Sequence, residues 1–209
     1  SDQDSDGKAQ TLHIVSSSGN SVDLGMTGED EDSTASIITD YGKLEVKNDG
    51  SYTFTLDNDS PSVEALNVNS PHTESFTVTT TDSHGASSTA QTINVEIQGV
   101  NNAPQNLTVA QTENSGTLHA TDVDAGDSLH YVIVQGDGAT TNAVGTYGHL
   151  DVDSSTGEFT YTANHDSDAY KALACGVDAT DSFKVEAVDS AGAHSDVQEV
   201  TFHVIGDNH

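Results

Sequence analysis

The chain contains two copies of one sequence pattern, and this internal repeat constrains its fold more than any other feature. Tyr41-Gly42-Lys43-Leu44-Glu45-Val46 returns as Tyr147-Gly148-His149-Leu150-Asp151-Val152, and Gly50-Ser51-Tyr52-Thr53-Phe54-Thr55 returns as Gly157-Glu158-Phe159-Thr160-Tyr161-Thr162. Further pairs keep one offset of 107 residues, since 166 − 59 = 107: Asp59 and Asp166, Leu66 and Leu173, Phe76 and Phe183, Asp82 and Asp189, Gly85 and Gly192, Gly99 and Gly206. A constant offset over this length predicts two copies of one domain.

Each copy alternates apolar and polar residues with a period of two, which is typical of half-buried β-strands. In the first copy Leu44 and Val46 precede a turn at Asn48-Asp49-Gly50, as in a β-hairpin. The second copy has seven candidate strands: Leu107–Ala110, Leu118–Ala120, Leu129–Val134, His149–Val152, Glu158–Thr162, Phe183–Val188 and Val200–Ile205. Seven short strands predict an all-β fold with two tandem immunoglobulin-like β-sandwich domains. Only Ser62–Leu66 and Asp168–Leu173 resemble helix, about one turn each.

We expect a first domain over residues 1–100, a linker over residues 101–104 and a second domain over residues 105–209. A strand ends near Gly99, and Pro104 cannot continue it. The first copy begins directly at Asp2-Gln3-Asp4, the counterpart of Asp122-Val123-Asp124, so its opening strand is expected to be missing. It also carries a longer acidic insertion, residues 16–39, to which the sequence assigns no role.

The charge of the chain excludes several classes of partner. The chain has 34 acidic residues, 5 lysines, no arginine and a formal net charge of −29. Such a chain repels phosphate backbones and anionic lipids, so we expect no nucleic-acid partner and no direct membrane insertion. Leu, Ile, Val and Phe make up about 20% of the residues, a level at which a highly charged chain is expected to be disordered. The single cysteine, Cys175, excludes an internal disulfide.

No catalytic pattern is present, and we expect no enzymatic activity. The ten histidines form no His-Glu-x-x-His motif and no Cys/His ligand spacing. The serines form no Gly-x-Ser-x-Gly elbow. Cys175 has no basic neighbours that would activate a thiolate, so it is interpreted as a small apolar residue.

One acidic loop has the composition of a calcium site. Asp122-Val123-Asp124-Ala125-Gly126-Asp127 places three carboxylates around a glycine that permits a sharp turn, and Ca²⁺ prefers six to eight oxygen ligands. The alternative is a solvated Asx turn between strands. Asp2-x-Asp4-x-Asp6-Gly7 is similar to the start of an EF-hand, but His13 stands at the position of the bidentate glutamate, so an EF-hand is rejected.

The order of the motifs resembles that of known calcium-binding repeats. Asp57-Asn58-Asp59, the Asp-x-x-Gly turns at Asp82 and Asp189, Asn101-Asn102-Ala103-Pro104 and Asp122-Val123-Asp124 are similar to the calcium motifs of cadherin-type tandem domains. The run from Tyr-Gly-x-Leu-x-Val through Asp-x-x-Gly resembles the VCBS repeat, a cadherin-like module of RTX-type bacterial surface adhesins. The likeness covers nearly the whole chain.

The resemblance implies three sets of calcium ligands, and Ca²⁺ is the cofactor that it predicts. The interdomain set is Asp57, Asp59, Asn101, Asn102, Asp122, Asp124 and Asp189. The C-terminal half-site is Glu113, Asn164, Asp166, Asp207 and Asn208. The N-terminal half-site is Asp2, Asp4 and Asp82.

From these features we expect a calcium-rigidified structural module of a large, secreted bacterial surface adhesin that supports cell adhesion and biofilm formation. Its partners would be adjacent repeats of the same parent protein, and its location would be the cell surface. The alternative is a calcium-dependent module that binds a peptide or glycan of a host or neighbouring cell. The missing strand motivates this alternative, because an exposed sheet edge accepts extended peptides.

Overall fold

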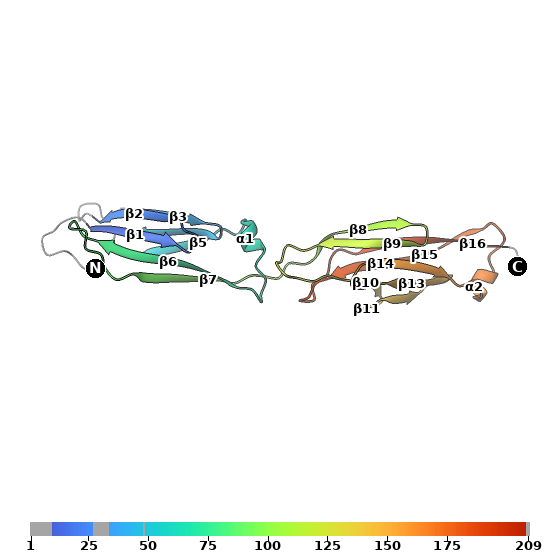
Figure 1. Cartoon of the computed structure of the whole chain (residues 1–209). Helices are drawn as coiled ribbons and strands as arrows, with labels where there is room; N and C mark the ends of the chain where they lie inside the picture. Colours follow the sequence, from blue (N-terminus) through green and yellow to red (C-terminus); the bar gives the residue numbers. More distant parts are fainter. Residues whose placement is uncertain (1–9, 27–33, 48, 208–209) are drawn as a thin grey trace. The chain divides into compact units, whose positions relative to one another are not determined.

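The computed structural model describes residues 10–26, 34–47 and 49–207 of the chain. These residues fall into two compact units, Ser1–Val100 and Asn101–His209, called unit 1 and unit 2 below (Figure 1). Asp2 and Asp4, two of the predicted calcium ligands, lie outside the described residues, as does Asn208.

Unit 2 is a sandwich of two antiparallel sheets. One sheet has the strand order β11-β10-β15-β16, and the other has the order β12-β13-β14-β9-β8. The strands are β8 (Gln105–Thr112), β9 (Ser115–Thr121), β10 (His130–Gln135), β11 (Gly138–Thr140), β12 (Asn142–Val144), β13 (Gly148–Val152), β14 (Glu158–Ala163), β15 (Asp178–Val188) and β16 (Gln198–Ile205). One helical turn, α2 (Asp168–Lys171), lies between β14 and β15.

Unit 1 repeats most of this arrangement. Its sheets have the orders β2-β1-β6-β7 and β3-β4-β5. The elements are β1 (Gln10–Ser16), β2 (Ser21–Met26), β3 (Thr34–Thr39), β4 (Gly42–Lys47), β5 (Tyr52–Leu56), α1 (Pro61–Glu64), β6 (His72–Thr81) and β7 (Gln91–Ile97). Strands β1 to β7 therefore correspond in order and pairing to β10 to β16, and no described strand of unit 1 corresponds to β8 or β9.

The predicted all-β fold of two tandem sandwich domains is confirmed, and each of the seven strands predicted for the second copy is present. Two strands were not predicted, β11 and β12, because three-residue strands are too short to show an alternating pattern. Their counterparts β2 and β3 lie within residues 16–39, so this segment contributes strands to both sheets of unit 1. The two expected helical turns are also present as α1 and α2.

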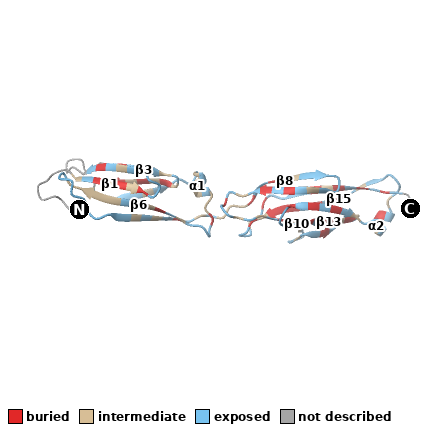
Figure 2. Ribbon diagram, in the orientation of Figure 1, coloured by how far each residue is buried: buried red, intermediate tan, exposed pale blue. Residues whose placement is uncertain are grey.

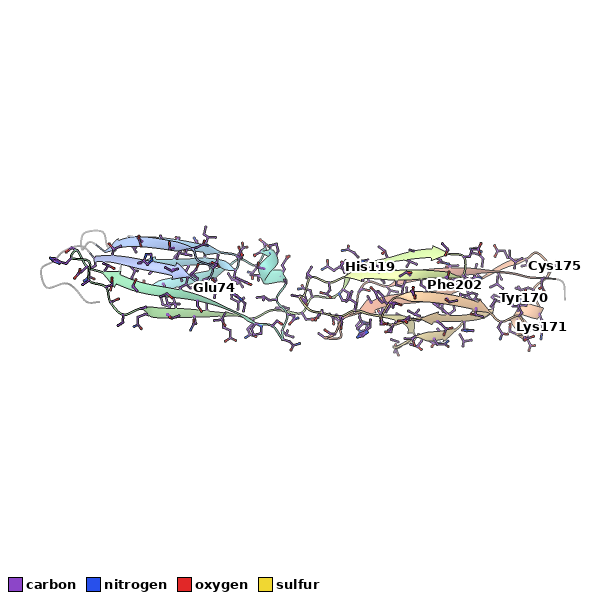
Figure 3. All side chains as sticks on the ribbon, in the orientation of Figure 1. Glu74, His119, Tyr170, Lys171, Cys175 and Phe202 are labelled. Atoms are coloured by element: carbon purple, nitrogen blue, oxygen red, sulfur yellow. The ribbon has the colours of Figure 1, made fainter. Side chains whose placement is uncertain are left out.

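The core of each unit consists of the apolar residues that alternate along its strands (Figure 2). In unit 2 the aromatic rings of Tyr161 and Phe202 stack with their centroids 4.6 Å apart, and Phe159 and Phe183 pack against Phe202. Phe202 is fully buried within unit 2 (Figure 3). The core of unit 1 has fewer buried residues, and its Phe54 is only partly buried.

A buried carboxylate fixes the turn before β13. Asp181 accepts hydrogen bonds from the backbone N–H groups of Thr146 and Tyr147 and from the hydroxyl of Tyr161. Burial raises the pKa of Tyr161, and the hydrogen bond to Asp181 raises it further, so this hydroxyl stays a donor. Asp181 therefore acts as a structural acceptor.

Both helices in the described part of the chain have four residues, and none is long and apolar enough to cross a membrane.

The repeat supplies a matched test of the two cores. Phe159 on β14 and Tyr52 on β5 occupy equivalent positions, but Phe159 is 3% exposed and Tyr52 is 54% exposed. We expect Phe159→Ala to lower the free energy of unfolding of unit 2 by about 3–5 kcal/mol, because it leaves a cavity. Tyr52→Ala should cost unit 1 less than about 1 kcal/mol. Denaturant unfolding of both variants measures the difference, and equal losses would contradict it.

Candidate metal site

Three chain segments converge at one end of unit 2. Asn101 and Asn102 precede β8, Asp122 follows β9, and Asp189 follows β15. Because β8 and β9 form an antiparallel hairpin in which Gln105 pairs with Thr121, the start of β8 and the end of β9 lie side by side. The hairpin therefore brings the Asn101-Asn102 segment to the acidic loop.

The acidic loop is ordered by its own backbone. The N–H of Asp124 donates to Oδ1 of Asp122 at 2.9 Å, and the N–H of Asp127 donates to the carbonyl of Asp124 at 3.3 Å. Gly126 has φ +85°, a conformation that an L-residue rarely adopts. The Asx turn considered from the sequence is thus present, and it uses one of the two carboxylate oxygens of Asp122.

Asp189 is buried in a second turn. Its Oδ1 accepts hydrogen bonds from the N–H groups of Ala191 and Ala193, and its Oδ2 accepts one from Nδ2 of Asn101 at 2.8 Å. Burial alone would raise the pKa of Asp189, but these hydrogen bonds outweigh it and hold the pKa below its ordinary value. Asp189 is therefore kept as a carboxylate in a site that is only 3% exposed.

Asp124 fastens the start of unit 2 to this end of the sandwich. Its Oδ2 accepts the backbone N–H of Asn102 at 2.7 Å, and its Oδ1 accepts Nδ2 of the same residue at 2.9 Å. Both oxygens of this buried carboxylate are thus engaged by one asparagine.

The remaining carboxylates form a close group. Asp122, Asp127 and Asp189 each place one oxygen within 4.8 Å of the others. Burial raises the pKa of Asp122, the hydrogen bond from Asp124 N–H lowers it by less, and the charges of the neighbouring aspartates raise it further. The group therefore carries unfavourable repulsion between like charges.

Three buried oxygen atoms at this place have no hydrogen-bond partner among the described residues. They are Oδ1 of Asn101, Oδ2 of Asp122 and Oδ2 of Asp127. The other oxygen of Asp127 accepts the hydroxyl of Ser190 at 2.8 Å. Unpaired buried oxygens are costly, so their concentration here fits a cation whose ligands they would be.

The structure brings together five of the predicted ligands: Asn101, Asn102, Asp122, Asp124 and Asp189. The two expected ligands from the first copy, Asp57 and Asp59, are exposed residues of unit 1 that follow β5, and their participation stays a prediction. Asp82 accepts the N–H groups of His84 and Ala86 within its own turn.

Of the predicted C-terminal ligands, the four described ones are exposed: Glu113, Asn164, Asp166 and Asp207. Glu113 lies in the turn between β8 and β9, Asp166 lies next to Lys171, and Asp207 follows β16. Within residues 10–26, 34–47 and 49–207, Asp122, Asp127 and Asp189 form the one group of three possible metal ligands at this spacing.

Asp127 lies in this carboxylate group but was not among the predicted ligands. It belongs to the acidic loop already identified, but the resemblance assigned roles to Asp122 and Asp124 alone. It follows Gly126, whose φ of +85° is a conformation that glycine adopts readily, and one of its oxygens lies within 4.8 Å of oxygens of Asp122 and Asp189.

A family model described as the bacterial cadherin-like domain matches residues 1–99 and again residues 101–206. The chain belongs to the bacterial cadherin-like domain family. The resemblance to cadherin-type tandem domains is thereby confirmed, whereas the VCBS and RTX context stays a prediction.

Solved structures of cadherins are among those that match this chain. Drosophila N-cadherin EC1-3 has 16% sequence identity and a TM-score of 0.33, with 88% of this chain and 57% of that chain covered. PcdhgB3 EC1-4 has 16% identity and a TM-score of 0.40, with 90% and 44% covered. This chain therefore spans about half the length of those structures. A search of curated protein sequences finds no match.

Cadherin-like domains typically bind calcium and are generally non-enzymatic adhesion modules. The donors in unit 2 fit such an ion, because they are carboxylate and amide oxygens and three of them are buried without another partner among the described residues.

Neutralising a carboxylate inside the group and one outside it should shift the thermal midpoint in opposite directions. In the presence of a chelator, Asp122→Asn should raise the thermal midpoint of unit 2 by a few degrees, because it removes a charge that burial and its neighbours disfavour. Asp153→Asn is the control: hydrogen bonds from Ser155 and Thr156 lower the pKa of Asp153, so its charge is favoured and the midpoint should fall. Calorimetry of both variants measures the sign of each shift in thermal midpoint, and two shifts of the same sign would contradict the prediction.

Proposed function

We propose that unit 2 binds Ca²⁺ through Asp122, Asp127, Asp189 and Asn101 Oδ1, and that the chain is a calcium-stiffened structural module of a bacterial surface adhesin. The observation that supports this most directly is the convergence of three unpartnered buried oxygens with three close carboxylates. Asn102 and Asp124 would act as positioning residues, since their hydrogen bonds hold the Asn101 segment at the site.

The donor set favours calcium over other metals. Zinc and copper sites use mainly histidine and cysteine, and neither is among the proposed ligands. Calcium takes six to eight oxygens in flexible geometry, so carboxylates, one amide oxygen and water can complete its coordination. Magnesium demands a stricter octahedron of shorter bonds.

The ion would change how firmly the start of unit 2 is held. Without it, the carboxylates repel one another, and the Asn101-Asn102 segment depends on hydrogen bonds alone. With it, Asn101 and all three aspartates would share one divalent cation. We infer that calcium restricts the motion of the segment that joins unit 1 to unit 2, which is the property required of a spacer between repeats.

The calcium affinity expected of such a module and the charge of the chain both support an extracellular setting. Extracellular calcium modules bind with dissociation constants of roughly 10⁻⁴–10⁻³ M, so they are loaded outside the cell and empty in the cytosol. Adjacent repeats of the parent protein would be the partners, and a net charge of −29 would keep a long array soluble in a medium containing salt. Cell adhesion and biofilm formation are the roles we propose for such an array.

Calcium should stabilise unit 2. At 10 mM calcium a site of this affinity contributes roughly 1.4–2.7 kcal/mol, so the thermal midpoint should rise by about 5 °C or more relative to chelator. Asp127→Asn and Asp189→Asn should abolish most of this rise. Asp137→Asn, which neutralises an exposed carboxylate in the same unit, should retain it.

Isothermal titration with calcium and small-angle scattering complete the test. The unsubstituted chain should bind at least one ion. When calcium is added, the distribution of radii of gyration that fits its scattering profile should become narrower. If Asp127→Asn and Asp189→Asn bind calcium as tightly as Asp137→Asn, the site is elsewhere and the proposal is wrong.

A further inference from the structure

Glu186 on β15 is a buried carboxylate that takes no part in the core or in the candidate metal site. Val185 and Ala187 on either side of it belong to the core of unit 2, so Glu186 points to the outer face of the sheet. It is nevertheless only 8% exposed, and its Oε1 lies 2.8 Å from Nδ1 of His194. This carboxylate is therefore removed from water with an imidazole as its partner.

The hydrogen bond determines which ring nitrogen of His194 is available. An ionised carboxylate only accepts hydrogen bonds, so Nδ1 of the neutral imidazole carries the proton and Nε2 presents its lone pair. Histidines that bind metals commonly donate their other ring N–H to a carboxylate, which orients the ring and makes it a better ligand. The side chain of His194 is 55% exposed, so an ion from solution can reach the ring.

A second histidine lies on the same face of this sheet. His130 on β10 pairs with Val188 on β15, and Val188 forms a bridge in turn with His194. Directly paired residues of antiparallel strands point to the same side of a sheet, so these three side chains share the outer face. Tyr131, next to His130, lies in the core, which agrees with an outward His130.

The two imidazoles are directed toward one place. Neighbouring strands are about 4.8 Å apart, so the backbones at His130 and His194 are about 10 Å apart, on opposite sides of β15. Because Glu186 belongs to β15 itself, its hydrogen bond draws the ring of His194 over this central strand, toward β10. The reach of an imidazole plus a Zn–N bond of about 2.0–2.1 Å exceeds half of the separation, so one ion can contact both rings.

Unit 1 carries hydroxyl residues at the equivalent places. Thr11 pairs with Thr81, and Thr81 bridges to Ser87, which repeats the pairing of unit 2. The hydroxyls of Thr81 and Ser87 bind each other at 2.9 Å. The counterparts of His130, Glu186 and His194 are, in that order, Thr11, Thr79 and Ser87. Two imidazoles and a carboxylate thus occur together in one repeat only, on a pairing of strands that both repeats share.

We propose that His130 and His194 bind a divalent transition metal ion, such as zinc, on the outer face of the sheet that contains β10 and β15. Glu186 is the positioning residue, because it holds His194 in the tautomer that can bind the ion. Imidazole nitrogen suits zinc, copper and nickel, whereas calcium takes oxygen ligands. The site shares no ligand with the proposed calcium site, and the inference does not depend on that function.

Sequence spacing does not reveal this pair of ligands. His130 and His194 are 64 residues apart, since 194 − 130 = 64, and they meet only through the pairing of both with Val188. The place is therefore a property of the sheet and not of a local motif.

The test is isothermal titration of the full chain with zinc chloride in excess calcium, which would keep calcium on the carboxylate group. We expect one saturable zinc site. His130→Gln and His194→Gln should each weaken it at least about tenfold, because losing a ligand costs no less than losing the residue that orients it. Both histidines are exposed, so neither change should lower the thermal midpoint measured in chelator.

The matched control is His203→Gln, which should leave zinc affinity unaltered. Nδ1 of His203 lies 3.0 Å from both oxygens of Asp178, so this histidine also has a carboxylate partner. Its partner across the strands is Thr180, which offers no second imidazole. The control also measures the attraction of any cation to a chain of net charge −29, which all variants share.

Nuclear magnetic resonance of the imidazole nitrogens identifies the ligands directly. Zinc should shift the ring nitrogen resonances of His130 and His194 and leave those of His203 unchanged. Glu186→Gln should weaken zinc binding roughly 10–100-fold. In the metal-free chain the same substitution should move the proton of His194 partly from Nδ1 to Nε2, a change that a purely structural role of Glu186 would not produce.

Three results would overturn the proposal. The first is equal zinc affinity of the unsubstituted chain, His130→Gln and His194→Gln. The second is equal weakening by His203→Gln. The third is loss of zinc binding in Asp127→Asn but not in His194→Gln, since the carboxylate group would then hold the zinc ion.

Discussion

The β8–β9 hairpin is the element on which the rest of unit 2 depends. Its pairing with β14 and its contact with β16 close the sandwich over Phe159 and Phe202. Its two ends deliver Asn102 and Asp122 to one place, because the strands of a hairpin begin and end side by side. Core closure and assembly of the candidate metal site are therefore consequences of the same antiparallel pairing. In unit 1 no described strand plays this part.

The second constraint is the charge, and the structure deals with buried carboxylates in two ways. Asp181 and Asp124 are satisfied by hydrogen bonds from neighbouring backbone and side-chain donors, so they need no cation. Asp122 and Asp127 each retain one buried oxygen without a partner among the described residues. Asp124 and Asp181 are buried and Asp122 and Asp127 are half-buried, and only the second arrangement leaves coordination capacity for an ion. One calcium ion would offset two of the 29 net negative charges, so it acts on the local cluster and leaves the overall charge to screening by salt.

Much of this was predictable from the sequence, and the failures have physical causes. The period of two identified the long strands because each buries one face, and the 107-residue offset aligned Asp82 with Asp189. The three-residue strands β11 and β12 were not predicted, because they are defined by pairing with neighbouring strands and are too short to show an alternating pattern. The sequence also did not predict that Asp124 accepts hydrogen bonds from Asn102 whereas Asp127 lies with Asp122 and Asp189. Ligand spacing alone does not reveal this difference.

Comparison of the two Asp-x-x-Gly turns separates a local motif from a site. Asp82 accepts N–H groups from the second and fourth residues after it, and Asp189 does the same. The same five-residue turn thus forms in either unit. Only Asp189 also receives the amide of Asn101, and it lies with Asp122 and Asp127 because the hairpin brings their segments to it. The acidic turn is therefore encoded locally, whereas its capacity to bind an ion is a property of the closed sandwich.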